Sequence, residues 1–109
     1  MKMVVAVMHS DDAIECIDAL AEKGIPTTRL DSHGGFLQKG NATLLCGVSE
    51  EQVETVLRVV REHSKARTEY LSPMPPLVEP GDFFVPYPVE VEVGGAIVFV
   101  LSVDRFEKL

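Results

Sequence analysis

The sequence predicts a small α+β domain in which two helices cover one face of an antiparallel sheet. Two continuous apolar stretches, residues 3–8 and 96–101, are rich in valine, which is typical of buried strands. Two segments with apolar residues at helical spacing follow Ser10 and Ser49, and each lies between strand-like segments. The order strand–helix–strand, repeated once, is that of a ferredoxin-like βαββαβ fold.

The first half of the chain contains one such unit and a third strand. Residues 3–8 are expected to form a strand buried on both faces, and Ser10 is a candidate cap for the following helix. Gly24 is expected to end this helix, because glycine readily adopts the left-handed conformation just after a helix. The β-branched segment 27–32 and the apolar segment 42–48 predict the next two strands.

The second half repeats this pattern in outline. Ser49 and Gln52 have the S-x-x-Q spacing of a capping box. The apolar residues of the helix that follows recur on one side, while Arg58 and Arg61 lie on the other. Residues 67–71 are expected to form the fourth strand of the sheet.

A C-terminal hairpin is expected to extend this sheet. Residues 89–93 alternate valine with glutamate, as a half-exposed strand does, whereas residues 96–101 are wholly apolar. Gly94 and Gly95 between them fit a two-residue hairpin turn. The proline-containing segment 72–84 is expected to be a long surface loop, and loops of this length in small domains usually serve a function.

Length, charge and hydropathy exclude several classes of protein. The 109 residues are expected to form a single domain. With 17 acidic and 10 basic residues the net charge is −7, which argues against a nucleic-acid-binding protein, because such proteins need a basic surface. No apolar run approaches the roughly 20 residues of a membrane span, and the N-terminal run is too short for a signal peptide. We therefore expect a cytoplasmic protein without membrane insertion.

No residue pattern indicates catalysis or a metal site. The three histidines, His9, His33 and His63, show no ligand spacing with each other or with the cysteines. Cys16 and Cys46 both lie among apolar residues, which predicts buried free thiols. The sequence contains no nucleophile elbow, H-x-x-E-H or C-x-x-C motif. We expect neither an enzyme nor a bound cofactor.

The glycine-bearing loop 34–41 is the most informative segment. Its paired glycines permit backbone conformations in which a ligand can approach main-chain N–H groups. Phe36 and Leu37 form an apolar pair that either folds into the core or contacts a ligand. Asn41 is either a turn residue before the next strand or an amide that pairs with the edge of a purine. By themselves these residues indicate a small-ligand loop.

Several blocks along the whole chain carry a family resemblance. They are G-G-F-L at 34–37, G-N at 40–41, V-P-Y-P-V-E-V at 85–91, V-G-G-A-I-V-F-V-L at 93–101 and R-F-E at 105–107. With these blocks the sequence resembles the cyclic di-AMP receptor family of PII-like signalling proteins. The resemblance implies a PII-like homotrimer that binds cyclic di-AMP in the clefts between subunits. It also implies signal transduction to a further, unidentified protein without catalysis, with the two loops, about 34–41 and 72–84, responding to the ligand.

The resemblance further implies which residues contact the ligand. Two adenines need apolar and aromatic surfaces together with hydrogen-bonding partners for their edges. Pro26 stands where family members often carry a basic residue, so Arg29 or Lys108 is a further candidate contact. Phe99 is expected to come from the neighbouring subunit. The positions that match the ligand-contacting residues of the family are Thr28, Gly35, Phe36, Leu37, Asn41, Gly47 and Phe99.

Two other functions stay open on the sequence. Because Pro26 and Lys108 depart from the family pattern, the protein could be a PII-like binder of another nucleotide such as ATP. It could also be a small ferredoxin-like enzyme that uses the cleft between subunits. The lack of a base–nucleophile pair or metal-ligand set in the sequence disfavours the enzyme.

Overall fold

The computed structural model describes residues 1–32, 40–71 and 89–109. The predicted loops at 34–41 and 72–84 lie almost wholly outside these residues. The expected helices and strands are present. In chain order they are β1 (Lys2–His9), α1 (Ser10–Glu22), β2 (Thr28–Ser32), β3 (Asn41–Val48), α2 (Glu50–His63), β4 (Arg67–Leu71), β5 (Val89–Val93) and β6 (Ala96–Ser102).

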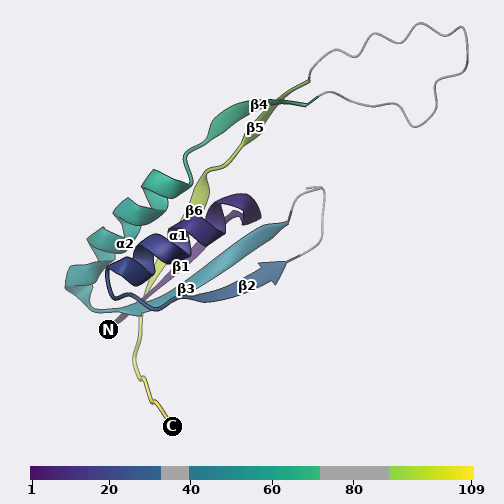
Figure 1. Ribbon diagram of the computed structural model, residues 1–109. Coiled ribbons are helices and arrows are strands. Elements are labelled where there is room, and N and C mark those ends of the chain that lie inside the picture. Colours follow the sequence, from purple (N-terminus) through teal and green to yellow (C-terminus); the bar gives the residue numbers. More distant parts are fainter. Residues whose placement is uncertain (33–39, 72–88) are drawn as a thin grey trace, which may run out of the picture.

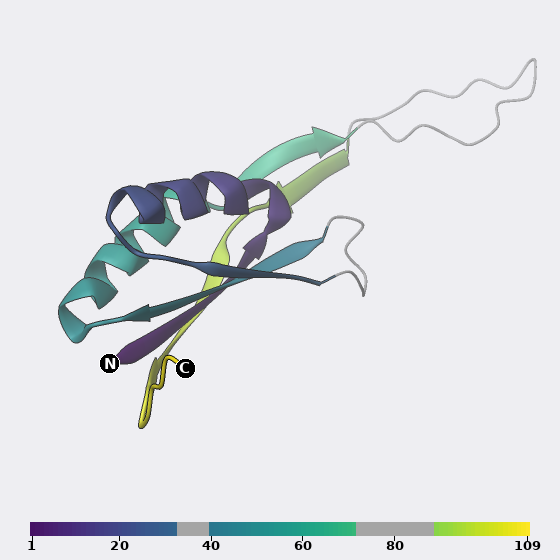
Figure 2. The ribbon, with the colours of Figure 1, turned by 60° about the horizontal axis from the view of Figure 1, so that its bottom comes forward.

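Four of the strands form an antiparallel sheet in the order β2–β3–β1–β6, and both helices pack on the same face of it (Figure 1). β4 and β5 pair with each other in a separate two-stranded ribbon. Figure 2 shows this ribbon extending away from the helices and the sheet. No helix in the described part of the chain is long and apolar enough to cross a membrane.

The position beside β1 is occupied by β6 and not by β4, so two topological expectations were wrong. Residues 67–71 do not complete the main sheet, and residues 89–101 do not form a hairpin. The reason is burial: β6 presents Ala96 and Val98 to the core, whereas β4 reads R-T-E-Y-L and has no such apolar face. An apolar strand gains more than a polar one from a place beneath the helices.

Two glycines allow the chain to pass from the ribbon into the main sheet. Gly94 and Gly95 have φ values of +88° and +82°, which other residues rarely adopt. The Gly95 N–H donates to the Ser64 carbonyl at the end of α2. A Cβ on Gly94 would collide with the Lys65 carbonyl oxygen. The predicted turn is therefore a corner between two sheets, packed against the segment that follows α2.

The core lies between the helices and one face of the sheet. Alternate residues of β1 and β3 are buried, because one face of each strand packs against the helices. Ile25, just after α1, joins them. Within one subunit β1 is therefore buried on one face and not, as its apolar sequence predicted, on both. The buried apolar residues from these strands and helices are Val4, Ala6, Met8, Ala42, Leu44, Cys46 and Val48 from the sheet, and Ala13, Cys16, Leu20, Val56, Val59 and Val60 from the helices.

The helix ends follow the sequence signals with one exception. Gly24 ends α1 with φ +75°, as predicted, and its N–H donates to the Ala21 carbonyl at 2.9 Å. At α2 the Gln52 side chain accepts from the Ser49 N–H at 3.0 Å, as the capping box predicts. At α1, however, the cap is His9, whose Nδ1 accepts from the Asp11 N–H at 3.2 Å.

Candidate functional site

The sheet face opposite the helices presents a row of residues that crosses all four strands. Residues directly opposite each other in an antiparallel pair point to the same face. Thr28 is opposite Leu45, Leu45 is opposite Val5, and Val5 is opposite Phe99. Because the flanking residues of β1 and β3 point into the core, this row points away from both helices.

Neighbouring rows extend this face in both directions. One row contains Leu30, Thr43, Val7 and Ile97, and another contains Gly47, Met3 and Leu101. We refer to these residues, the first row and Asn41 as the open face. Four of its large apolar side chains, Leu30, Ile97, Phe99 and Leu101, are 46–63% exposed. A continuous apolar surface of this kind marks an interaction site.

Four of the predicted ligand contacts lie on the open face. Thr28 is on β2, Asn41 and Gly47 are at opposite ends of β3, and Phe99 is on β6. A Cβ on Gly47 would meet no atom within 4 Å, so the backbone there is accessible to a bound molecule. The structure therefore combines an apolar surface with a hydroxyl, an amide and an accessible stretch of backbone.

The structure does not place the other predicted contacts on this face. Arg29 has the opposite parity on β2, and its Nε donates to Asp31 Oδ1 at 2.7 Å. Lys108 lies in the exposed segment after β6. Gly35, Phe36 and Leu37 lie outside the described residues. Whether any of these residues contacts a ligand stays a prediction.

The charge of the open face suits an anionic or neutral ligand. The chain carries a net charge of −7, yet none of the described residues that make up the open face is acidic. Carboxylates near a bound phosphate would repel it and weaken binding. This face thus avoids the main electrostatic penalty that an acidic protein imposes on an anionic ligand.

The two cysteines are buried free thiols, as predicted. The pKa of Cys16 is raised to about 11, mainly by burial and to a smaller extent by the nearby Cys46 and Asp12. Burial also raises the pKa of Cys46, although its contact with Thr27 lowers it. Both groups stay protonated at neutral pH, which does not suit a nucleophile or a metal ligand. Among the described residues, no group of three or more His, Cys, Asp and Glu is placed to hold a metal.

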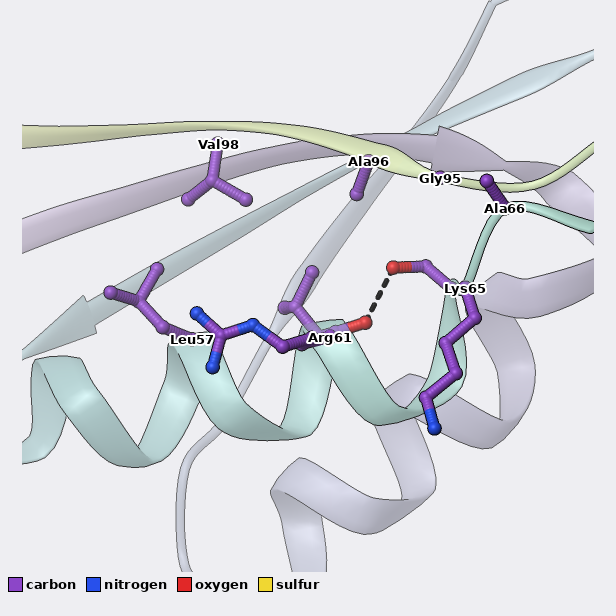
Figure 3. Close-up of a pocket in the computed structure, with 9 residues that line it drawn as sticks. Leu57, Arg61, Lys65, Ala66, Gly95, Ala96 and Val98 are labelled. Atoms are coloured by element: carbon purple, nitrogen blue, oxygen red, sulfur yellow. Dashed lines mark hydrogen bonds between the residues drawn. The ribbon is translucent and has the colours of Figure 1, made fainter.

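A groove of about 600 Å³ lies on the helix side of β6, between that strand and α2. Figure 3 shows Leu57 and Arg61 of α2 facing Ala96 and Val98 across it. The dashed line is the hydrogen bond from Ser64 Oγ to the Val60 carbonyl. Of the predicted site residues that the structure describes, none lines this groove. The sequence did not indicate it, because it forms only when β6 takes the place next to β1.

Comparison with known proteins assigns the family. The sequence model of a family described as the cyclic-di-AMP receptor matches residues 1–109, the whole chain. The chain belongs to the cyclic-di-AMP receptor family. The resemblance read from its sequence blocks is thereby confirmed, and membership of a receptor family supports ligand binding and signalling as its role.

The fold is also similar to a solved structure. That structure is the crystal structure of a functionally unknown protein from Pediococcus pentosaceus, with 37% sequence identity and a TM-score of 0.75. The match covers 99% of this chain and 96% of the other. The likeness supports a small α+β fold with two helices and an antiparallel sheet, compatible with the ferredoxin-like class.

Proposed function

We propose that this protein is a non-catalytic cyclic di-AMP sensor that binds its ligand against the open face and transmits the bound state to another protein. The observation that carries the proposal is the placement of Thr28, Asn41, Gly47 and Phe99 on that face, in a chain of the cyclic-di-AMP receptor family. These four positions lie on three different strands, and the strand register brings Thr28 and Phe99 to the surface that Asn41 and Gly47 share.

The chemistry of the open face matches the parts of cyclic di-AMP. Adenine rings bind well to aromatic and aliphatic surfaces, which Phe99 and the neighbouring apolar side chains supply. The amide of Asn41 can donate and accept at the edge of a purine, and the hydroxyl of Thr28 can do either. The accessible backbone at Gly47 permits close approach of the sugar–phosphate ring.

The width of the sheet favours a site shared between subunits. Thr28 and Phe99 lie at opposite edges of the sheet, three strand spacings apart. With about 4.8 Å per spacing, their backbones are roughly 14 Å apart within one subunit. A ligand that contacts both Thr28 and Phe99 is more readily bound where β2 of one subunit lies near β6 of a neighbouring subunit. A homotrimer would supply three such places and cover the exposed apolar side chains.

Calorimetric titration of the purified protein with cyclic di-AMP, cyclic di-GMP and ATP tests this function. We expect tight binding of cyclic di-AMP alone, with one ligand per subunit in a trimer. Thr28→Ala should weaken binding by roughly tenfold, because each lost hydrogen bond is worth about 1 kcal/mol or slightly more. Tyr70→Ala, on the ribbon outside the open face, is the control.

Two results would contradict the proposal. Tight binding of ATP with no binding of cyclic di-AMP would support the alternative hypothesis that the protein binds another nucleotide. Chromatographic detection of a consumed nucleotide would show that the protein is an enzyme.

A further inference from the structure

The first turn of α1 makes two contacts with segments that are remote in sequence. One of them is with Gly40, directly before β3. The Ser10 Oγ donates to the Gly40 carbonyl at 2.6 Å, and the Ser10 N–H donates to the same oxygen at 3.1 Å. Gly40 is adjacent to Asn41, a residue of the open face. The start of α1 is therefore tied to the end of the open face that carries Asn41.

The second contact is with the base of the β4–β5 ribbon. Asp12 is only 9% exposed, and its two carboxylate oxygens accept from Arg67 Nη2 at 3.0 Å and Nη1 at 3.4 Å. Arg67 Nη1 also donates to the Lys65 carbonyl at 3.3 Å. A Cβ on Gly94 would meet both that carbonyl and the Arg67 guanidinium. Asp12 thus holds the point at which both ribbon strands leave the body of the protein.

These contacts are not ordinary helix capping. Serine and aspartate at a helix start usually satisfy the free N–H groups of their own helix. Here His9 caps the helix through its Nδ1, so the side chains of Ser10 and Asp12 serve other segments. Two residues of one helical turn thereby link the beginning of β3 to the beginning of β4.

We infer that the first turn of α1, residues 10–12, is a positioning element that couples the Asn41 end of the open face to the orientation of the β4–β5 ribbon. A helical turn is stiff, so a displacement of Gly40 moves Ser10 and Asp12 together. Asp12 is buried, and separating it from Arg67 would leave an unpaired charge away from water. A displacement of this helical turn should therefore also displace the base of the β4–β5 ribbon. That ligand binding is the event that moves Gly40 rests on the function proposed above.

The coupling itself can be measured without ligand, by residue-resolved hydrogen exchange. Two backbone amides serve as reporters: the Ser10 N–H, which donates to Gly40, and the Gly95 N–H, which donates to Ser64 at the ribbon base. Ser10→Ala removes the hydroxyl contact, and Arg67→Lys keeps the charge but loses the two-pronged guanidinium contact. Leu44, in the core of β3, reports global unfolding.

Each variant should accelerate exchange at the distant reporter. We expect Ser10→Ala to accelerate exchange of the Gly95 N–H, and Arg67→Lys that of the Ser10 N–H, by about fivefold or more relative to Leu44. The matched control is Glu15→Gln, which changes the same helix one turn later, where Glu15 faces His63 of α2 at 4.0 Å. It should move neither reporter. If each variant affects only its own end of the helical turn, the inference is wrong.

A second experiment adds cyclic di-AMP. In the wild-type protein the ligand should change exchange at both Asn41 and Gly95. In Asp12→Asn it should still change exchange at Asn41, while the response of Gly95 should be lost. An undiminished Gly95 response in Asp12→Asn would overturn the coupling. If the wild-type protein binds no cyclic di-AMP, the proposed function fails, and the ligand-free experiment still decides the coupling by itself.

Discussion

Phe99→Ala should weaken subunit association strongly while leaving each subunit folded. Phe99 is 54% exposed on the open face, so about half of its side chain is available for burial by a neighbouring subunit. An aromatic side chain has roughly 200 Å² of surface, and about 110 Å² would thus be buried. At about 25 cal/mol per Å², this burial contributes about 2–3 kcal/mol for each subunit.

Sedimentation equilibrium of the wild-type protein and the variant measures this effect. With three subunits affected, the protein concentration at half-dissociation should rise by roughly a hundredfold or more, taking about 1.4 kcal/mol per decade. Tyr70→Ala is the matched control, because Tyr70 is a more exposed aromatic residue, at 69%, but lies on the ribbon. Its midpoint should equal that of the wild-type protein.

Two outcomes would refute this reasoning. A wild-type protein that is monomeric at all concentrations would show that the open face is not covered by other subunits. A trimeric Phe99→Ala protein that dissociates at the wild-type concentration would show that Phe99 lies outside the interface. Circular dichroism of the variant should match the wild type, because Phe99 is not part of the core.

Three further predictions concern burial, charge and backbone conformation. Burial raises the pKa of Cys16 from 9.0 to about 11, so its thiol ionises at lower pH in the unfolded chain than in the folded protein. The free energy of unfolding should therefore fall between pH 9 and 11, and denaturation curves of Cys16→Ala should show a smaller fall. Asp12→Asn should lower the free energy of unfolding by about 1–3 kcal/mol, since it removes the nearly buried charge that pairs with Arg67. Glu15→Gln, at an exposed position, should change it by under about 0.5 kcal/mol; equal effects of the two substitutions would contradict the role of burial. Gly94→Ala should lower the free energy of unfolding by more than about 1 kcal/mol, because Gly94 has a positive φ and its Cβ would meet the Lys65 carbonyl. Gly47→Ala should leave the melting temperature unchanged and weaken only ligand binding; a larger loss of stability in Gly47→Ala than in Gly94→Ala would refute the assignment of both positions.

Local structure was largely predictable from the sequence. Both helices, the strands and the ending of α1 at Gly24 follow from short-range signals, which depend on residues close together in the chain. The family was predictable as well, because its sequence blocks occur along the whole chain. The cap of α1 was predicted wrongly: Ser10 contacts Gly40 instead, and that partner is 30 positions away.

Strand pairing was decided only by the tertiary structure. The sequence of a strand-like segment does not identify its partner, and residues 67–71 and 96–101 were both predicted as strands of the same sheet. The more apolar strand, β6, occupies the buried place beside β1 under the helices, and β4 pairs with β5 instead.

For the candidate site, too, the sequence predicted the residues, and the strand pairing determined how they are arranged. The sequence indicated Thr28, Arg29 and Phe99 as candidate contacts without showing on which face of a sheet each of them lies. Strand register places Thr28 and Phe99 on the open face and Arg29 on the other, because side chains alternate between the faces of a sheet. Residue types were thus determined by the sequence, whereas the surface they share depends on pairings between residues as much as 98 positions apart along the chain, as for Met3 and Leu101.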